Sequence, residues 1–155
     1  MGKIYNFVLN ASNGTGADHS KAFLVDWDKI PDYKPLKLTF SFVTNDTGDA
    51  FAQIANIYCN LGQSQNYFGT GDSMTNSRGD YLGFLVPVSY PIAGGLFYES
   101  VRADLNTNPP IYLYRRPQQS NITVEIKTST NQQTNYVNAL GNYTLILSFE
   151  EIEEK

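Results

Sequence analysis

The sequence predicts an all-β fold, a single jelly-roll-like antiparallel β-sandwich of about eight strands. Residues 36–42 alternate apolar and polar side chains without a break. Because successive side chains on a strand point to opposite faces, this segment has one apolar face and one polar face. Residues 121–127 repeat the pattern, and no stretch of comparable length has the spacing of a helix. These observations indicate strands along the whole chain.

A series of short segments is predicted as strands, and turn-forming residues separate them. In chain order the strands are residues 3–9, 22–26, 36–43, 51–59, 81–86, 97–101, 111–115, 122–127 and 143–149. Gly and Asn between them adopt positive φ angles readily, and Pro ends a ladder because it lacks a backbone N–H. Short strands joined by long loops are typical of sandwiches, including jelly rolls.

Two segments are less regular. The apolar residues at positions 51, 54, 55 and 58 also fit one face of a helix, but the apolar run that ends at Cys59 favours a strand. Residues 62–80 are predicted as one long loop, and loops of this length are often functional. A short turn is predicted near residues 29–31.

The composition favours a single domain, residues 1–155, that works through its surface. Charged residues make up 17% of the chain, below the roughly 25% of an average domain, and there are 11 Tyr and 9 Phe. A polar surface with few charges can pack against a neighbour without burying unpaired charges. An all-β protein with Asn-rich loops would have the same composition. The net charge of -4 argues against a general nucleic-acid binder.

Cys59 is the single cysteine of the chain, so it cannot form an intramolecular disulfide. Its apolar neighbours predict a small buried core residue, and one thiol fits a reducing compartment. The sequence contains no run of about 20 apolar residues, so no membrane span is expected, and its first residues lack the apolar segment of a signal peptide.

The motifs that could carry catalysis each have a simpler explanation. Asp46-Thr47-Gly48 matches the core of retroviral-type aspartic proteases, but polar residues precede it and a turn explains it better. Arg78-Gly79-Asp80 spells the integrin-binding tripeptide, and a turn into the next strand accounts for it. His19 is the single histidine, and one His with one Cys cannot make a zinc site. We therefore predict no enzyme, no cofactor and no metal.

Several short motifs together carry a family resemblance. They are Tyr5 to Ser12, Trp27 ahead of residues 36–42, Asn108-Pro109-Pro110-Ile111-Tyr112-Leu113, Arg116-Pro117, residues 121–127 and Tyr143 to Glu150. In these motifs the chain resembles the small capsid-associated, single jelly-roll proteins of large double-stranded DNA viruses that infect algae and protists. The resemblance implies a structural virion protein of the minor capsid or penton type, without a catalytic site. It also implies assembly in the host cytoplasm, contact with other capsid proteins, and a homo-oligomer or hetero-assembly.

If the chain works through contacts, its aromatic loops and paired arginines are the expected interface. The candidates are Tyr67, Phe68, Tyr90, Phe97, Arg115, Arg116 and Tyr136. The two adjacent arginines could clamp a carboxylate or phosphate, although an edge strand protected by charge and Pro would look the same.

Two further functions remain open from the sequence. A lectin-like, carbohydrate-binding sandwich would stack sugars on exposed aromatic side chains, with Trp27, Tyr67 and Tyr114 as candidates. An aspartic-type hydrolase would depend on Asp46. A short trimeric module of the tumour-necrosis-factor kind would share the sandwich and differ in its strand connections.

Overall fold

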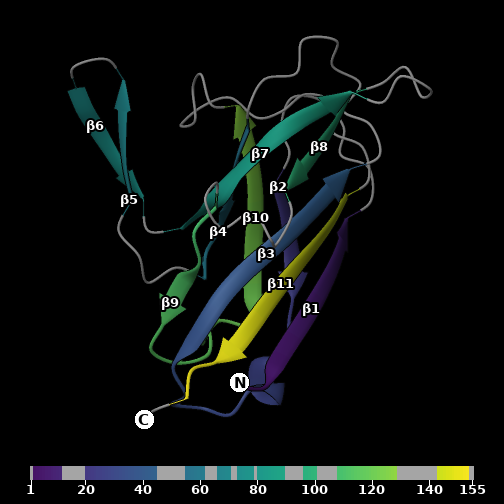
Figure 1. Cartoon of the computed structure of the whole chain (residues 1–155), viewed down its shortest axis with the longest axis vertical. Helices are drawn as coiled ribbons and strands as arrows, with labels where there is room; N and C mark the ends of the chain where they lie inside the picture. Colours follow the sequence, from purple (N-terminus) through teal and green to yellow (C-terminus); the bar gives the residue numbers. More distant parts are fainter. Residues whose placement is uncertain are drawn as a thin grey trace.

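The protein is an antiparallel β-sandwich, seen in a computed structural model that describes residues 2–11, 20–44, 55–61, 66–70, 73–78, 80–89, 96–100, 108–128 and 143–153 (Figure 1). One layer has the strand order β1-β11-β3-β8 and the other the order β7-β4-β10-β2. The strands are β1 Ile4–Ala11, β2 Ser20–Leu24, β3 Leu36–Thr44, β4 Ala55–Cys59, β5 Asn66–Thr70, β6 Ser73–Arg78, β7 Tyr81–Ser89, β8 Leu96–Ser100, β9 Ile111–Leu113, β10 Asn121–Thr128 and β11 Tyr143–Glu151.

The strand β7 joins the two layers. Its residues 81–85 pair with β4 in one layer, and its residues 86–89 pair with β8 in the other. The register shifts between Ile57 and Tyr58, where β4 meets the start of β7. The short strand β9 pairs with β3 outside this main path. The two layers are therefore one continuous hydrogen-bonded sheet folded over at β7.

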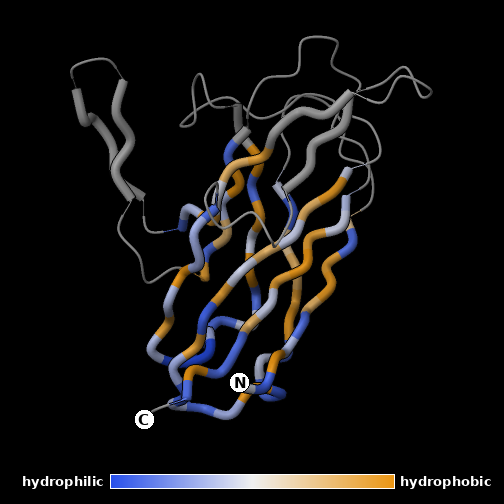
Figure 2. The backbone as a smooth tube through the Cα atoms, in the orientation of Figure 1, coloured by the Kyte–Doolittle hydropathy of each residue, from blue (hydrophilic) through white to orange (hydrophobic). Residues whose placement is uncertain are grey.

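The alternation in β3 becomes a burial pattern. Leu36, Leu38, Phe40 and Phe42 are buried, whereas the residues between them remain partly accessible. Its partner β11 pairs with it over nine residues, from Tyr143 opposite Thr44 to Glu151 opposite Leu36, so both strands turn their apolar side chains to the same face. Figure 2 colours the alternation of apolar and polar residues along β3. The period of two thus places one face of the layer in the core, as the sequence predicts.

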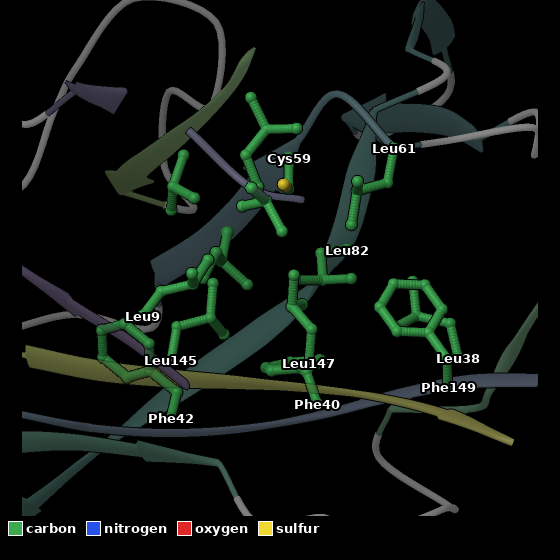
Figure 3. Packing of buried hydrophobic residues seen from close by; sticks show 14 of the residues in the cluster. Leu9, Leu38, Phe40, Phe42, Cys59, Leu61, Leu82, Leu145, Leu147 and Phe149 are labelled. Atoms are coloured by element: carbon green, nitrogen blue, oxygen red, sulfur yellow. The ribbon is translucent and has the colours of Figure 1, made fainter. Parts of the chain in front are cut away.

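The core lies between the layers and takes side chains from both. Figure 3 shows the side chains of β3 and β11 facing those of β4 and β7, with Leu147 pointing toward Leu82. Fully burying a Leu, Ile or Phe side chain stabilises a fold by roughly 1.5–3 kcal/mol. The largest fully buried side chains are Tyr58, Phe42, Phe149, Ile30, Leu36, Leu38, Ile57, Leu85, Ile122 and Ile126.

The predicted antiparallel sandwich is confirmed, and several boundaries differ. The strand predicted at residues 22–26 is β2, Ser20–Leu24, because Asp26 caps a 3-10 helix, η1 Trp27–Lys29, by accepting a hydrogen bond from the Asp28 N–H at 2.9 Å. The strand predicted at residues 111–115 ends at Leu113. Of the segment predicted at residues 51–59, positions 55–59 form β4 and positions 51–54 lie outside the described residues.

The prediction of one long loop over residues 62–80 is wrong. The strands β5 and β6 pair with each other there as a separate antiparallel hairpin (Figure 1). Its register shifts between Phe68 and Gly69, so a glycine interrupts the alternation that would reveal a strand. Among the described residues there is no helix long and apolar enough to cross a membrane.

Candidate functional site

The strands β1, β11 and β3 form a surface on the side of their layer that points away from the core. We call it the outer face. By the alternation of these strands it comprises Ile4, Asn6, Val8, Asn10, Lys37, Thr39, Ser41, Val43, Thr144, Ile146, Ser148 and Glu150. The cross-strand register lines them up in rows, such as Val8 beside Ile146 beside Ser41.

The outer face carries no net charge. Within the set just named, Lys37 and Glu150 carry charge, and they sit opposite each other in the register of β3 and β11. The polar groups bond within the face: the Ser148 Oγ donates to Asn6 Oδ1 at 2.6 Å. Likewise, the Thr144 Oγ1 donates to Asn10 Oδ1 at 2.7 Å. A neighbour could therefore cover this face at a small desolvation cost.

Exposed apolar side chains stand in the same face. Val8 keeps 55% of its surface accessible, and Ile4 and Val43 are also exposed. Tyr112 of β9 is exposed as well, and it extends the row of Lys37 because the two residues are paired in register. Aliphatic and aromatic side chains among uncharged polar ones are the usual make-up of a protein contact.

The predicted interface arginines act inside the chain. The Arg115 Nη2 donates to Asp32 Oδ2 at 3.1 Å and to Gln118 Oε1 at 3.0 Å. The Arg116 Nη1 donates to the Ile30 carbonyl at 2.7 Å. An ion pair between Arg116 Nη2 and Asp28 Oδ1, 3.4 Å long, adds to these contacts. The two side chains therefore tie the segment after η1 to the segment after β9.

The structure describes only some of the other predicted interface residues. Tyr67 and Phe68 lie on β5, opposite Ser77 and Asn76 of β6, and Phe97 lies on β8 opposite Val88. The structure describes the backbone of these strands. Tyr90 and Tyr136 lie outside the described residues, as do His19 and the Asp46-Thr47-Gly48 motif. For these residues a contact role stays a prediction.

Trp27 cannot stack on a sugar, so this candidate of the lectin hypothesis is wrong. It is 4% exposed, and its Nε1 donates to the Gln119 carbonyl at 2.7 Å. Its ring meets Phe7 and Phe149 edge-on, with centroids 4.9 and 5.5 Å away. The indole is part of the core because β1, β11 and η1 converge there. Tyr114, by contrast, is 84% exposed.

Cys59 is a core residue, as predicted. Burial raises the pKa of its thiol to about 12, and the nearby Asp80 carboxylate adds to the effect. A neutral, buried thiol is a poor nucleophile. Within the described part of the chain there is also no group of three or more His, Cys, Asp or Glu side chains arranged to hold a metal.

Two features escape the sequence analysis. One is the outer face, although the sequence contains a signal for it: the outward-facing positions of residues 36–42 and 143–149 are mostly Thr, Ser or Ile. The other is Tyr33, an exposed tyrosine in the bend after η1 with a positive φ of 60°. No sequence pattern predicts the positive φ of Tyr33, because Tyr is not a residue that favours such an angle.

No protein-family model matches the chain, and no curated protein matches it.

Proposed function

We propose that this chain is a structural virion protein, a minor capsid or penton-type jelly roll that works by contacting neighbouring capsid proteins. The observation that carries the proposal is the outer face of β1, β11 and β3, which has no net charge and exposes the apolar side chains of Ile4, Val8 and Val43. Its location would be the virion, with assembly in the host cytoplasm, and its partners would be copies of itself or other capsid proteins.

The strand pairing supports a jelly roll. If the eight strands of the two layers are numbered in chain order, the first pairs with the eighth, the second with the seventh, the third with the sixth and the fourth with the fifth. All four pairs are antiparallel. One long hairpin rolled into two sheets has this pattern, and jelly rolls are a common architecture of viral capsid domains.

The outer face supports work by contact. A capsid holds many copies of its subunits, so weak contacts add through avidity. Each contact must bury surface without isolating a charge. Because Lys37 and Glu150 face each other, they can neutralise one another when a neighbour covers them. Val8 and Ile146, paired in one row, supply the apolar centre.

The oligomeric mass of the purified chain tests the proposal. Light scattering across concentration should give a closed oligomer, a pentamer for the penton type. The variant Val8→Lys introduces a charge beside Ile146 in the outer face and should weaken that oligomer by about tenfold or more. Val8 is exposed, so the variant should still fold.

Leu24→Lys is the matched control, because Leu24 is an exposed aliphatic residue on β2 of the other layer. It should leave the oligomer intact. Equal weakening by both variants would contradict a contact through the outer face, and a monomer at every concentration would contradict the penton type. The virion location is tested separately by mass spectrometry of virus particles purified from cells that make the chain. Its absence from such particles would refute the proposal.

A further inference from the structure

A hollow lies where both ends of the described chain meet the bend after η1. Its volume is about 530 Å³, and its walls are formed by Gly2, Lys3, Tyr33, Lys34, Pro35, Glu151, Ile152 and Glu153. Sites for small molecules usually have volumes of about 300–1,000 Å³. The hollow is thus large enough for a small ligand, and it lies apart from the residues of the outer face.

Backbone hydrogen bonds hold the walls together. The Glu151 N–H donates to the Lys3 carbonyl at 2.9 Å, and the Ile152 N–H donates to the Pro35 carbonyl at 3.0 Å. The end of β11 is thereby fixed to both flanking segments. Gly2 lies so close to Glu151 that any side chain at position 2 would collide with the Glu151 backbone. The hollow is therefore preformed by the backbone.

Tyr33 is held rigidly at the rim. Its φ of 60° is one that L side chains rarely adopt, and Asp32 Oδ1 stabilises the bend by accepting from the Tyr33 N–H at 2.9 Å. The Arg115 guanidinium covers one face of the ring, 4.3 Å from its centroid. Arg115 is itself held by Asp32 and Gln118. Nevertheless, the tyrosine stays 75% exposed.

Strain that the surroundings maintain at an exposed aromatic residue is typical of a binding site. In the core, burial of the tyrosine ring would compensate for a strained backbone, whereas the Tyr33 ring stays mostly exposed. The ring is already ordered, so a ligand that stacks on it would lose less conformational entropy on binding.

The charges of the hollow balance. Lys3 and Lys34 oppose Glu151 and Glu153, so an anionic ligand would meet two carboxylates and a cationic ligand two ammonium groups. A neutral ligand whose hydroxyl groups both donate and accept can bond to a carboxylate and to an ammonium group alike. A ligand with an apolar face could in addition pack on the tyrosine ring.

We propose that this hollow is a binding site for a neutral saccharide, with Tyr33 as the stacking platform. The C–H groups on one face of a sugar ring would lie on Tyr33. The hydroxyl groups would donate to Glu151 or Glu153 and accept from Lys3 or Lys34. This site goes beyond the structural role proposed above and does not rest on it.

A glycan array carrying neutral, sialylated and sulfated glycans provides the test, followed by NMR titration with the neutral sugar that binds best. The intact chain should bind at least one class of neutral sugar. Tyr33→Gly removes the ring and tolerates the positive φ, so it should fold and lose affinity by about tenfold or more. Leu24→Ala removes an exposed apolar side chain outside the hollow and should leave affinity unchanged.

Three results would overturn the proposal. The first is no binding of any neutral sugar at about 10 mM, a concentration that reveals even weak sites. The second is binding that Tyr33→Gly leaves intact while circular dichroism reports a folded variant. The third is a preference for sialylated or sulfated glycans, which would mean that the carboxylates do not take part. None of these results depends on the oligomeric mass, so the saccharide site and the structural role can fail separately.

Discussion

At the residue scale, Tyr33 combines an exposed ring with a positive φ of 60°. A β-branched residue tolerates such an angle poorly, whereas glycine adopts it without steric cost. The contacts of Asp32 and Arg115 with Tyr33 offset the strain in the native chain. The backbone of this bend is therefore set by its neighbours and not by the preference of tyrosine.

Two variants at position 33 measure that strain. Both Tyr33→Gly and Tyr33→Val remove the ring and its contact with Arg115, so their difference isolates the backbone. Tyr33→Val should lower the free energy of unfolding by about 1–2 kcal/mol more than Tyr33→Gly does. Urea unfolding followed by circular dichroism measures the difference. Equal stability of the two variants would mean that the bend relaxes freely.

Trp27 is the residue with the largest expected effect on stability outside the strands. Trp27→Phe deletes the hydrogen bond to the Gln119 carbonyl and leaves unfilled volume beside Phe7 and Phe149. It should cost about 2–3 kcal/mol of unfolding free energy. Tyr112→Phe, at an exposed position, is the control and should change stability by less than about 0.5 kcal/mol. Thermal unfolding of both variants checks the prediction, which fails if their losses are similar.

At the element scale, β7 is stabilised by the side-chain amide of Asn108, which makes hydrogen bonds of the kind that a neighbouring strand would make. The Asn108 Oδ1 accepts from the Phe84 N–H at 2.8 Å, and its Nδ2 donates to the Phe84 carbonyl at 3.0 Å. The amide thus replaces a strand partner for β7, next to the position where β7 passes from one layer to the other. Gly83 leaves room for this contact, because a Cβ there would collide with Asn108 Oδ1 and come within 2.6 Å of Phe40 Cε1.

Asn108→Ala should leave the Phe84 N–H and carbonyl without this partner. We expect a loss of about 1–3 kcal/mol of unfolding free energy. Asn108→Asp retains the acceptor for the Phe84 N–H and removes the donor to the Phe84 carbonyl. It should therefore also lower the unfolding free energy, but through loss of the second hydrogen bond alone. Hydrogen exchange of the Phe84 amide distinguishes the two: it should become fast in Asn108→Ala and stay slow in Asn108→Asp. Fast exchange already in the native chain would contradict the role of Asn108.

At the scale of the whole molecule, the burial of one thiol and two phenol groups makes the stability of the fold depend on pH in the alkaline range. The pKa of Cys59 rises from 9.0 to about 12, and that of Tyr81 from 10.0 to about 12, mainly because burial disfavours the charged forms. Burial also raises the pKa of Tyr143. At pH values between the ordinary pKa values of these groups and their raised pKa values in the fold, the unfolded chain releases protons that the folded chain keeps. Stability is therefore complete below pH 9 and falls as the pH rises toward 12.

Urea unfolding at a series of pH values should follow this slope. The unfolding free energy should decline from about pH 9 upward in the native chain. Cys59→Ala removes the group with the lowest unfolded pKa, so its decline should begin near pH 10, where tyrosine starts to ionise. A midpoint that stays constant to pH 11 in the native chain would contradict burial of these groups.

The elements most fully predicted are those whose evidence is local. Residues 36–42 and 121–127 alternate in polarity, and the period of two assigns their faces whatever strand lies beside them. The hairpin of β5 and β6 was missed because glycine interrupts its pattern. Of the candidate sites, the buried Cys59 followed from its apolar neighbours, whereas the burial of Trp27 did not follow from its polar ones.

Local sequence is enough to predict that the chain forms strands, which faces of those strands are apolar, and that Cys59 is buried, because each of these depends on residues close together in the chain. The tertiary structure decided the rest. It folds one sheet over at β7, aligns the uncharged positions of three strands into a face, and brings Arg115 to Asp32 across 83 residues. Contacts at such separations depend on which strands pair, and no local period records that choice.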